Sequence, residues 1–274
     1  MSTSNFIQLL RTEKFKNHTV EFNKIFRDIE TLCFSYPLLI LNKKKVVQKL
    51  LSYMENEELK SARGIILDLC IALIKDLRHE VYEEFLHDIL PKAIQVLDAE
   101  NLDMMEKVFQ LLSFSFKYLI KPIKENIRAV FSVYIMLLEH KNRFIRKFSA
   151  QSFSYALRKV NIDSEFVNFM GSLLDDESAP TADRVNGISE LIFEVVSGHG
   201  DELHSKGESI LAEILASEKV CSSQPFRQMI RILLLKLVNA IDIHKLGAIF
   251  EQLIKHLANT ADQTRLTLLF KVLN

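Results

Sequence analysis

The chain has 274 residues, of which 35 are basic and 35 acidic, so its formal net charge is +0. This balance excludes nucleic-acid binding that is driven by the overall charge of the chain. If the chain binds nucleic acid, it must do so through local basic patches. Hydrophobic residues make up 48% of the chain, but there are only 7 glycines and 5 prolines, too few for the many turns of a β-sandwich or barrel. The composition therefore favours a helical protein with a large core.

The three cysteines, Cys33, Cys70 and Cys221, lie far apart in the sequence. Their odd number is typical of a protein from a reducing compartment, and Cys70, within an apolar run, is expected to be a buried free thiol. No N-terminal stretch has the apolar length of a signal peptide, and no apolar run reaches the length of a membrane span. We therefore expect an intracellular protein that does not insert into membranes.

Apolar residues recur at helical spacing along nearly the whole chain, and alternation of period two is almost absent. Residues 1–17 are polar and are predicted to form a flexible segment. The predicted helices then cover about residues 18–32, 37–51, 57–77, 81–97, 101–120, 122–138, 142–160, 163–174, 180–196, 201–216, 225–239, 244–257 and 261–274. The basic run 43–45 and Pro91 are expected to interrupt or bend their helices, and Asn142 and Asp163 are expected to cap theirs.

Two successive predicted helices with their turns span roughly 40 residues, which is the period of HEAT and armadillo repeats. Residues 65–77 and 104–119 are apolar on nearly every side, so these helices need neighbours on both flanks. We therefore predict an all-α fold, an α-solenoid of HEAT/armadillo-like helical hairpin repeats that is continuous over residues 18–274. The apolar residues 268–273 lack a polar cap, so the stack is expected to be truncated at its C-terminal end.

No pattern of an enzyme or cofactor site is complete in the sequence. His79 and Glu80 could begin a zinc-binding helix, but the fourth residue after His79 is Glu83 rather than histidine. Gly198 and Gly200 lack the third glycine and the preceding strand of a dinucleotide site, and the acidic residues 175–177 are expected to form a solvated turn. The sequence therefore predicts no enzymatic activity, no cofactor, no metal and no small-molecule substrate.

Basic residues concentrate in the middle of the chain. The possible contacts with RNA or a partner are Lys117, Lys121, Arg143, Lys147, Arg158 and Lys159. In the predicted helix 142–160, the stripe opposite the core comprises Arg143, Lys147, Ser154 and Arg158. Two interpretations stay open: these side chains solvate the outer face and offset the helix dipole, or they meet RNA phosphates or an acidic partner. Arg146 is instead expected to support the neighbouring repeat.

Residues 104–160 carry a resemblance to a known family. The matching segments are Met104–Phe109 (MMEKVF), Phe116–Leu119 (FKYL), Leu137–Asn142 (LLEHKN), Ile145–Phe153 (IRKFSAQSF) and Leu157–Val160 (LRKV), with support from residues 38–49, 67–69, 75–77 and 187–196. Together they resemble the N-terminal region of the small subunit processome component 20 family, also called the down-regulated-in-metastasis family of U3 small nucleolar RNA-associated HEAT-repeat proteins. The sequence departs from the family pattern at Ile120, Ser149 and Gln151, where the family commonly has an aromatic residue, alanine and glutamate; these changes leave the expected fold intact.

The resemblance implies a non-catalytic scaffold of the small-subunit processome, which acts in ribosome biogenesis by processing precursor rRNA toward the small-subunit rRNA. The implied partners are pre-ribosomal RNA and processome proteins, and the implied location is the nucleus and nucleolus. Members of the family are several times longer than this chain, in line with the expected truncation. The alternative is a HEAT-repeat adaptor that binds linear peptide motifs in nuclear transport or phosphatase regulation.

Overall fold

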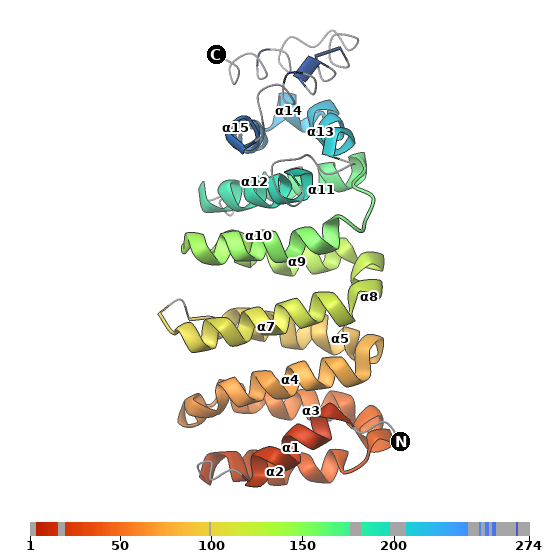
Figure 1. Cartoon of the computed structure of the whole chain (residues 1–274), viewed down its shortest axis with the longest axis vertical. Coiled ribbons are helices and arrows are strands. Elements are labelled where there is room, and N and C mark those ends of the chain that lie inside the picture. The colour runs from red at the N-terminus through yellow and green to blue at the C-terminus, as the bar shows by residue number, and fades with distance from the viewer. Residues whose placement is uncertain are drawn as a thin grey trace. The chain divides into compact units, whose positions relative to one another are not determined.

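A computed structural model describes residues 4–15, 20–98, 100–175, 182–197 and 207–240, together with the single positions 247, 250, 251, 254, 255 and 267. Every regular element in this described part of the chain is helical, so the protein is all-α (Figure 1). The chain divides into two compact units, Met1–Val133 and Tyr134–Asn274. Within the residues that the structure describes, no helix is long and apolar enough to cross a membrane.

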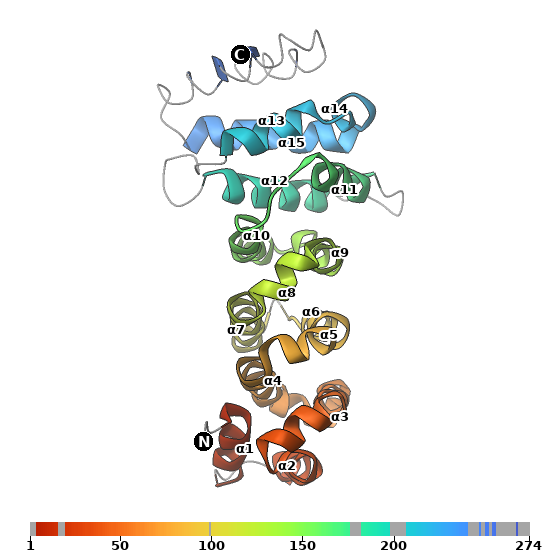
Figure 2. The same cartoon turned by 90° about the vertical axis from the view of Figure 1, so that its right-hand side faces the viewer.

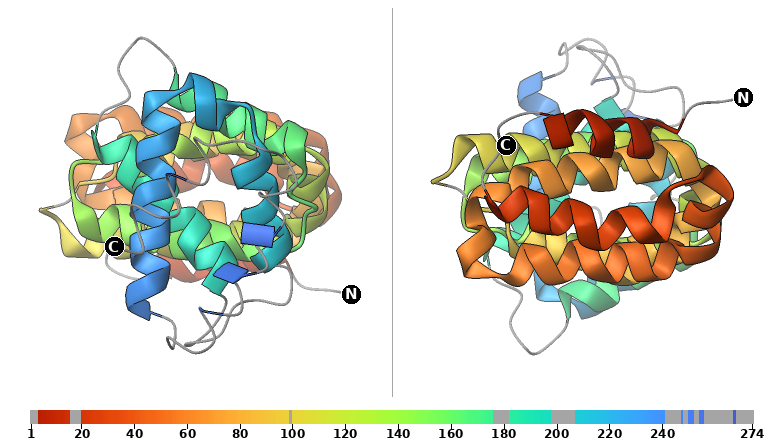
Figure 3. Two further views of the ribbon diagram at one scale, coloured as in Figure 1. Left: turned by 90° about the horizontal axis from the view of Figure 1, so that it is seen from above. Right: turned by 90° about the horizontal axis from the view of Figure 1, so that it is seen from below.

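The first unit is built around α4. Its helices are α1 (Asn5–Phe15), α2 (Val20–Cys33), α3 (Tyr36–Glu55), α4 (Arg63–Leu77), α5 (Tyr82–Glu84), α6 (Leu90–Gln95), α7 (Leu102–Tyr118), α8 (Ile120–Glu125) and the first part of α9 (Ile127–Leu138). Helix α4 packs against α1, α3 and α7, and α2 packs along α3 (Figures 2 and 3). Nine of the 15 residues of α4 are buried, which confirms that its apolar residues need neighbours on more than one side. One of them is Cys70, whose pKa is raised to about 12 by burial, so this thiol stays protonated at neutral pH.

Helix α1 is the first difference from the prediction, which placed a flexible segment over residues 1–17. Asp76, near the end of α4, accepts hydrogen bonds from the backbone N–H groups of Asn5 (3.0 Å) and Phe6 (2.8 Å) and from the hydroxyl of Ser4 (2.6 Å). The side chains of Phe6 and Leu10 are buried. A carboxylate that is distant in sequence thus satisfies the donors that begin the helix.

The basic run 43–45 does not interrupt α3, which is continuous from Tyr36 to Glu55, so the interruption expected there was wrong. Lys43 donates to the carbonyl oxygen of Glu80 and lies 3.9 Å from a carboxylate oxygen of Glu84. Lysine is itself a good helix former, and Lys44 and Lys45 are exposed, so the run continues the helix.

Three predicted helices of this unit are divided in the structure. Residues 57–77 begin with a 3₁₀ turn (Glu57–Ala62), and residues 81–97 contain a π-helical turn (Phe85–Ile89) immediately before α6. Pro91 follows that turn and has no N–H to continue the regular ladder, which confirms the break expected there. The predicted helix 122–138 is split at Asn126, whose side chain donates to the carbonyl oxygen of Pro122 at 3.2 Å.

In the described part of the second unit, the end of α9 is followed by six further helices. These are α10 (Arg143–Leu157), α11 (Ser164–Leu174), α12 (Ala182–Ser197), α13 (Gly207–Ala216), α14 (Lys219–Ser222) and α15 (Gln224–Ala240). Helix α12 lies between α10 and α15, and α11 contacts α13 and α15. The helix α14 was not predicted, and the predicted helices 244–257 and 261–274 lie outside the described residues except for single helical positions.

Both predicted caps in this unit are confirmed. The carboxamide oxygen of Asn142 accepts from the N–H of Phe144 (2.8 Å), and the carboxylate of Asp163 accepts from the N–H of Phe166 (2.9 Å). Helix α10 ends at Leu157, three residues earlier than predicted. These caps fix where α10 and α11 begin, and hence which side chains of α10 face outward.

The core side of α10 holds an aromatic pair. The rings of Tyr134 and Phe153 stack with their centroids 4.6 Å apart, and the Tyr134 hydroxyl donates to the carbonyl oxygen of Ser149 at 3.1 Å. Ser154, predicted on the outward stripe, is buried, so that placement was wrong. Its hydroxyl donates to the carbonyl oxygen of Gln151, which lets a serine occupy the interior.

Candidate functional site

The six basic residues predicted as possible contacts fall into two groups. Lys117 and Lys121 belong to the first unit, where both are exposed, and the Lys117 ammonium lies 5.6 Å from the centroid of the Tyr118 ring. The other four belong to the second unit, on α10 and just after it. There Lys159 is exposed and its ammonium lies 4.8 Å from the centroid of the Tyr155 ring.

Arg158 does not share the environment of Arg143 and Lys147, with which it was placed on one stripe. Its guanidinium is half-buried and donates to the carbonyl oxygen of Glu194 near the end of α12. Desolvation by burial lowers the pKa of Arg158, and the nearby charge of Glu194 opposes this effect. Arg158 therefore ties α10 to α12, and its contact with RNA or a partner stays a prediction.

Arg143 and Lys147 open into a cleft formed by three helices of the second unit. The cleft has a volume of about 300 Å³. Its lining comprises Arg143, Arg146 and Lys147 from α10, Asn186 and Glu190 from α12, and Lys236 from α15. Four cationic side chains thus face one carboxylate, in a chain whose net charge is +0.

Two of the four cations are already paired. The Arg146 guanidinium lies 2.8 Å from a carboxylate oxygen of Asp183 and donates to the carbonyl oxygens of His140 (2.7 Å) and Lys141 (3.0 Å). Lys236 pairs with Glu190 across α12 and α15. Arg146 therefore has the structural role predicted for it, because it anchors the start of α12 to the turn before α10.

Arg143 and Lys147 are exposed, and neither has an ion pair within the part of the chain that the structure describes. They stand four residues apart on α10, so their side chains lie on the same face of the helix. An arginine can hold a phosphate through two parallel hydrogen bonds, and a nearby lysine adds a point charge. The two side chains are the part of the cleft that is available to an anion.

Close backbone packing positions the α12 wall of the cleft. A Cβ atom at Gly187 would lie 1.8 Å from the carbonyl oxygen of Leu138, so only glycine fits there. Arg184 adds an ion pair to Glu139 at 2.6 Å and donates to the carbonyl oxygen of Leu173 at 3.0 Å. These contacts hold Asn186 and Glu190 opposite α10.

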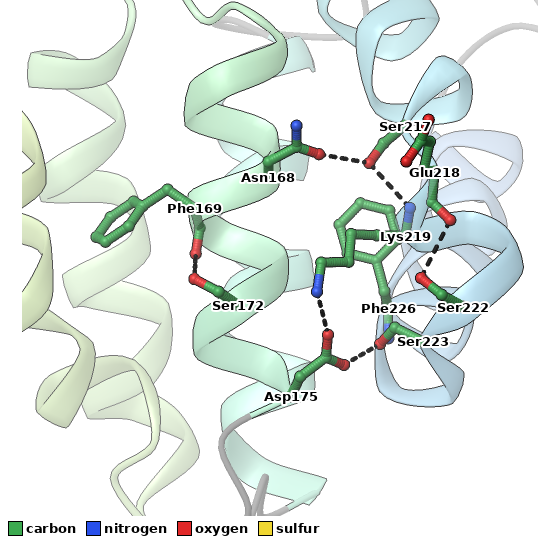
Figure 4. A network of polar contacts seen from close by, with 10 residues as sticks. All are labelled: Asn168, Phe169, Ser172, Asp175, Ser217, Glu218, Lys219, Ser222, Ser223 and Phe226. Carbon is green, nitrogen blue, oxygen red and sulfur yellow. Dashed lines mark hydrogen bonds and ion pairs between the residues drawn. The ribbon is translucent and has the colours of Figure 1, made fainter.

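A second polar cluster joins α11 to α14 and α15 (Figure 4). Asp175 accepts from the ammonium of Lys219 at 2.6 Å and from the hydroxyl of Ser223, which in turn accepts from the backbone N–H of Phe226 at 3.1 Å. Desolvation by burial raises the pKa of Asp175, but the hydrogen bonds from Lys219 and Ser223 outweigh this effect and bring the pKa below its usual value. The solvated turn predicted for residues 175–177 is therefore wrong for Asp175, which fastens one end of α11; residues 176 and 177 lie outside the described ranges.

The arrangement of the cleft suits anion binding. The described residues contain no group of three His, Cys, Asp or Glu side chains placed to hold a metal ion. Only one carboxylate lines the cleft, and it is engaged by Lys236. No general acid or base therefore converges with a nucleophile among the residues that line it.

Sequence reasoning missed Asn186, Glu190 and Lys236 as parts of the site. These residues come from helices that follow α10 by many residues, and no local motif links them to Arg143. The available signal was weak: Lys236 is a polar residue in an otherwise apolar run of α15. Only the packing of α10, α12 and α15 shows that these three residues line one cleft with Arg143.

Fold and cleft together define an all-α protein with a cationic cleft between helices. No model of a known protein family matches the chain. The chain is similar to U3 small nucleolar RNA-associated protein 20 of Saccharomyces cerevisiae, with 24% identity over 281 residues that cover 100% of this chain. The chain spans only 11% of the length of that relative. This similarity supports the relationship expected from the sequence, at a distant level.

Proposed function

We propose that the chain is part of a non-catalytic scaffold that acts in maturation of the small ribosomal subunit, in the nucleus and nucleolus. The observation that carries the proposal is the similarity of the whole chain to a yeast protein associated with U3 small nucleolar RNA. The resemblance of residues 104–160 to the processome component 20 family points the same way. Pre-ribosomal RNA and processome proteins are the proposed partners.

The proposed architecture is an α-solenoid of HEAT-like helical hairpins continuous over residues 18–274. Packing within each unit supports it: α4 lies between α1 and α7, and α12 lies between α10 and α15. Such stacking buries helices that are apolar on nearly all sides, as α4 is. A scaffold of this kind binds through extended surfaces rather than through a single catalytic pocket.

The proposed RNA contact is the cleft of α10, α12 and α15. Arg143 and Lys147 supply two cations that have no ion-pair partner among the described residues, and the cleft of about 300 Å³ has room for a phosphate group and part of its sugar. Each phosphate neutralised on a single strand contributes about −0.7 to the slope of log K against log salt concentration. Two such contacts would change that slope by roughly 1.4 units.

The first test follows the full-length protein in cells. Its sedimentation is compared with that of precursor rRNA in a gradient, and precursor processing is measured after depletion. Comigration with a large particle and accumulation of unprocessed small-subunit precursor support the proposal. A protein found only in light fractions, with normal processing after depletion, overturns it.

The second test isolates the cleft. Arg143→Glu/Lys147→Glu is compared with Lys124→Glu/Arg231→Glu, a matched double charge reversal at exposed positions that do not line the cleft. Binding of labelled oligouridylate is measured by fluorescence anisotropy at several salt concentrations. We expect the cleft variant to lose at least about tenfold in affinity and to show a shallower salt slope, with unchanged helix content. Equal binding by both variants removes the cleft from the proposal, and preference for an acidic peptide over RNA favours the linear-motif adaptor instead.

A further inference from the structure

An exposed apolar cluster lies where α2 ends and α3 begins, in the first unit. Its members are Phe34, Tyr36, Ile40 and Leu41, with exposed fractions of 62%, 40%, 36% and 78%. The other large hydrophobic side chains that are exposed in the described chain lie apart from one another in the sequence. Scattered exposed hydrophobic residues are normal on a protein surface, whereas a contiguous cluster indicates an interaction site.

Along α3 this cluster continues into a cationic one. Lys44 follows Ile40 by four residues and Lys45 follows Leu41 by four, so the same face changes from apolar to basic over one turn. Both lysines are exposed, and neither has an ion pair with any described residue. Lys43, by contrast, is engaged with Glu80. We call the surface made by Phe34, Tyr36, Ile40, Leu41, Lys44 and Lys45 the α3 face.

The α3 face is held in place by its own unit. The Tyr36 hydroxyl donates to the carbonyl oxygen of Asp76 at 3.0 Å, which fixes the aromatic ring at the start of the helix. On the opposite side of α3, Leu39, Val46 and Leu50 are fully buried. The helix backbone and the Tyr36 ring are therefore in place before a partner binds, which reduces the free energy lost to ordering on binding.

We propose that the α3 face binds an acidic amphipathic segment of a partner protein. The apolar side chains of the segment cover Phe34, Tyr36, Ile40 and Leu41, and its carboxylates pair with Lys44 and Lys45. Charge complementarity selects the occupant, because two unpaired ammonium groups at the edge of an apolar surface favour glutamate or aspartate next to leucine-like residues. The inference does not depend on the proposed function of the cleft.

The experiment uses a phage library of random 16-residue peptides selected on the whole chain, with affinities of the recovered peptides measured by fluorescence anisotropy. Two variants remove the two parts of the surface: Phe34→Ser/Leu41→Ser and Lys44→Glu/Lys45→Glu. The control Leu102→Ser changes a side chain of the same unit that is 72% exposed and lies outside the α3 face. The changed residues are exposed, so the variants are expected to keep the helix content and melting temperature of the wild type.

We expect recovered peptides in which apolar residues at helical spacing are followed by glutamate or aspartate. Each double variant should weaken their binding by about tenfold to a hundredfold, as expected for losing one or two buried apolar side chains or two ion pairs. Leu102→Ser should bind as the wild type does. The proposal is overturned if no recovered peptide is sensitive to either double variant, or if the recovered peptides lack acidic residues. Displacement of the peptides by oligouridylate would also overturn it, as would conversion of a dimer of the chain to a monomer by Phe34→Ser/Leu41→Ser.

Discussion

Replacement of Gly187 by alanine probes the closest backbone approach in the second unit. A Cβ atom at this position would lie 1.8 Å from the carbonyl oxygen of Leu138, and real Cβ contacts stay beyond 3.0 Å, so the two backbones must separate by about 1.2 Å, the difference between these distances. Overpacking of this kind costs about 3 kcal/mol, and the better helix propensity of alanine recovers about 1 kcal/mol. The net loss of about 2 kcal/mol should lower the melting temperature of this unit by roughly 4–8 °C.

The assay is thermal unfolding followed by circular dichroism, with two other glycines as controls. At Gly64, in α4, an added Cβ meets nothing within 4 Å, so Gly64→Ala should stabilise its unit by about 0.5–1 kcal/mol. At Gly171 the Cβ would lie 2.8 Å from the Cγ of Lys219, whose ammonium is held by Asp175, so Gly171→Ala should also destabilise the unit, but by less than Gly187→Ala because a side chain rather than a backbone has to move. A Gly187→Ala protein that melts at or above the wild-type temperature would refute the reasoning.

Three further predictions concern the supports of α10 to α12. Asp163→Ala should cost about 1 kcal/mol through loss of the α11 cap, and Asp163→Asn should stay near wild type; equal losses would argue against the cap. Arg146→Ala should cost about 1–3 kcal/mol in denaturant unfolding, and Arg146→Lys should recover only part, since lysine cannot bridge Asp183 and two carbonyls as a planar fork does. Desolvation, together with the charges of Lys141 and Arg146, lowers the pKa of His140 below 6.5 in the folded protein. The unfolded chain therefore binds a proton at this histidine more readily, and the free energy of unfolding should fall as the pH drops from 6.5. His140→Gln should remove this component of the pH profile.

Local signals in the sequence predicted much of the helical content. The N-caps at Asn142 and Asp163 were predictable because a cap acts within three residues of its own helix. The break near Pro91 was predictable because proline removes a donor wherever it stands. Helix α1 was missed because its start depends on Asp76, which lies seventy residues beyond Phe6 in the sequence. Such features depend on which helix lies alongside, and a helical period alone does not contain that information.

The residues of the candidate site were likewise predictable only where a local pattern in the sequence places them. Arg143 and Lys147 were identified from the sequence, since a four-residue spacing places both on one helical face. Arg158 has the same type of charge but is half-buried against the carbonyl oxygen of Glu194, because α12 packs along that end of α10. Lys236 and Glu190 could be assigned to the cleft only from the packing of α12 against α15.

The cap that Asp76 provides for α1 has a consequence for synthesis on the ribosome. Helix α1 has 11 residues, and an isolated helix of that length is marginal in water. The first N–H groups of α1 and its buried Phe6 find their partners only after α4 has left the exit tunnel, so α1 is completed after a helix that is translated later. The segment that forms α1 therefore stays open to chaperones while about seventy residues are added, roughly 4–14 s at ordinary elongation rates.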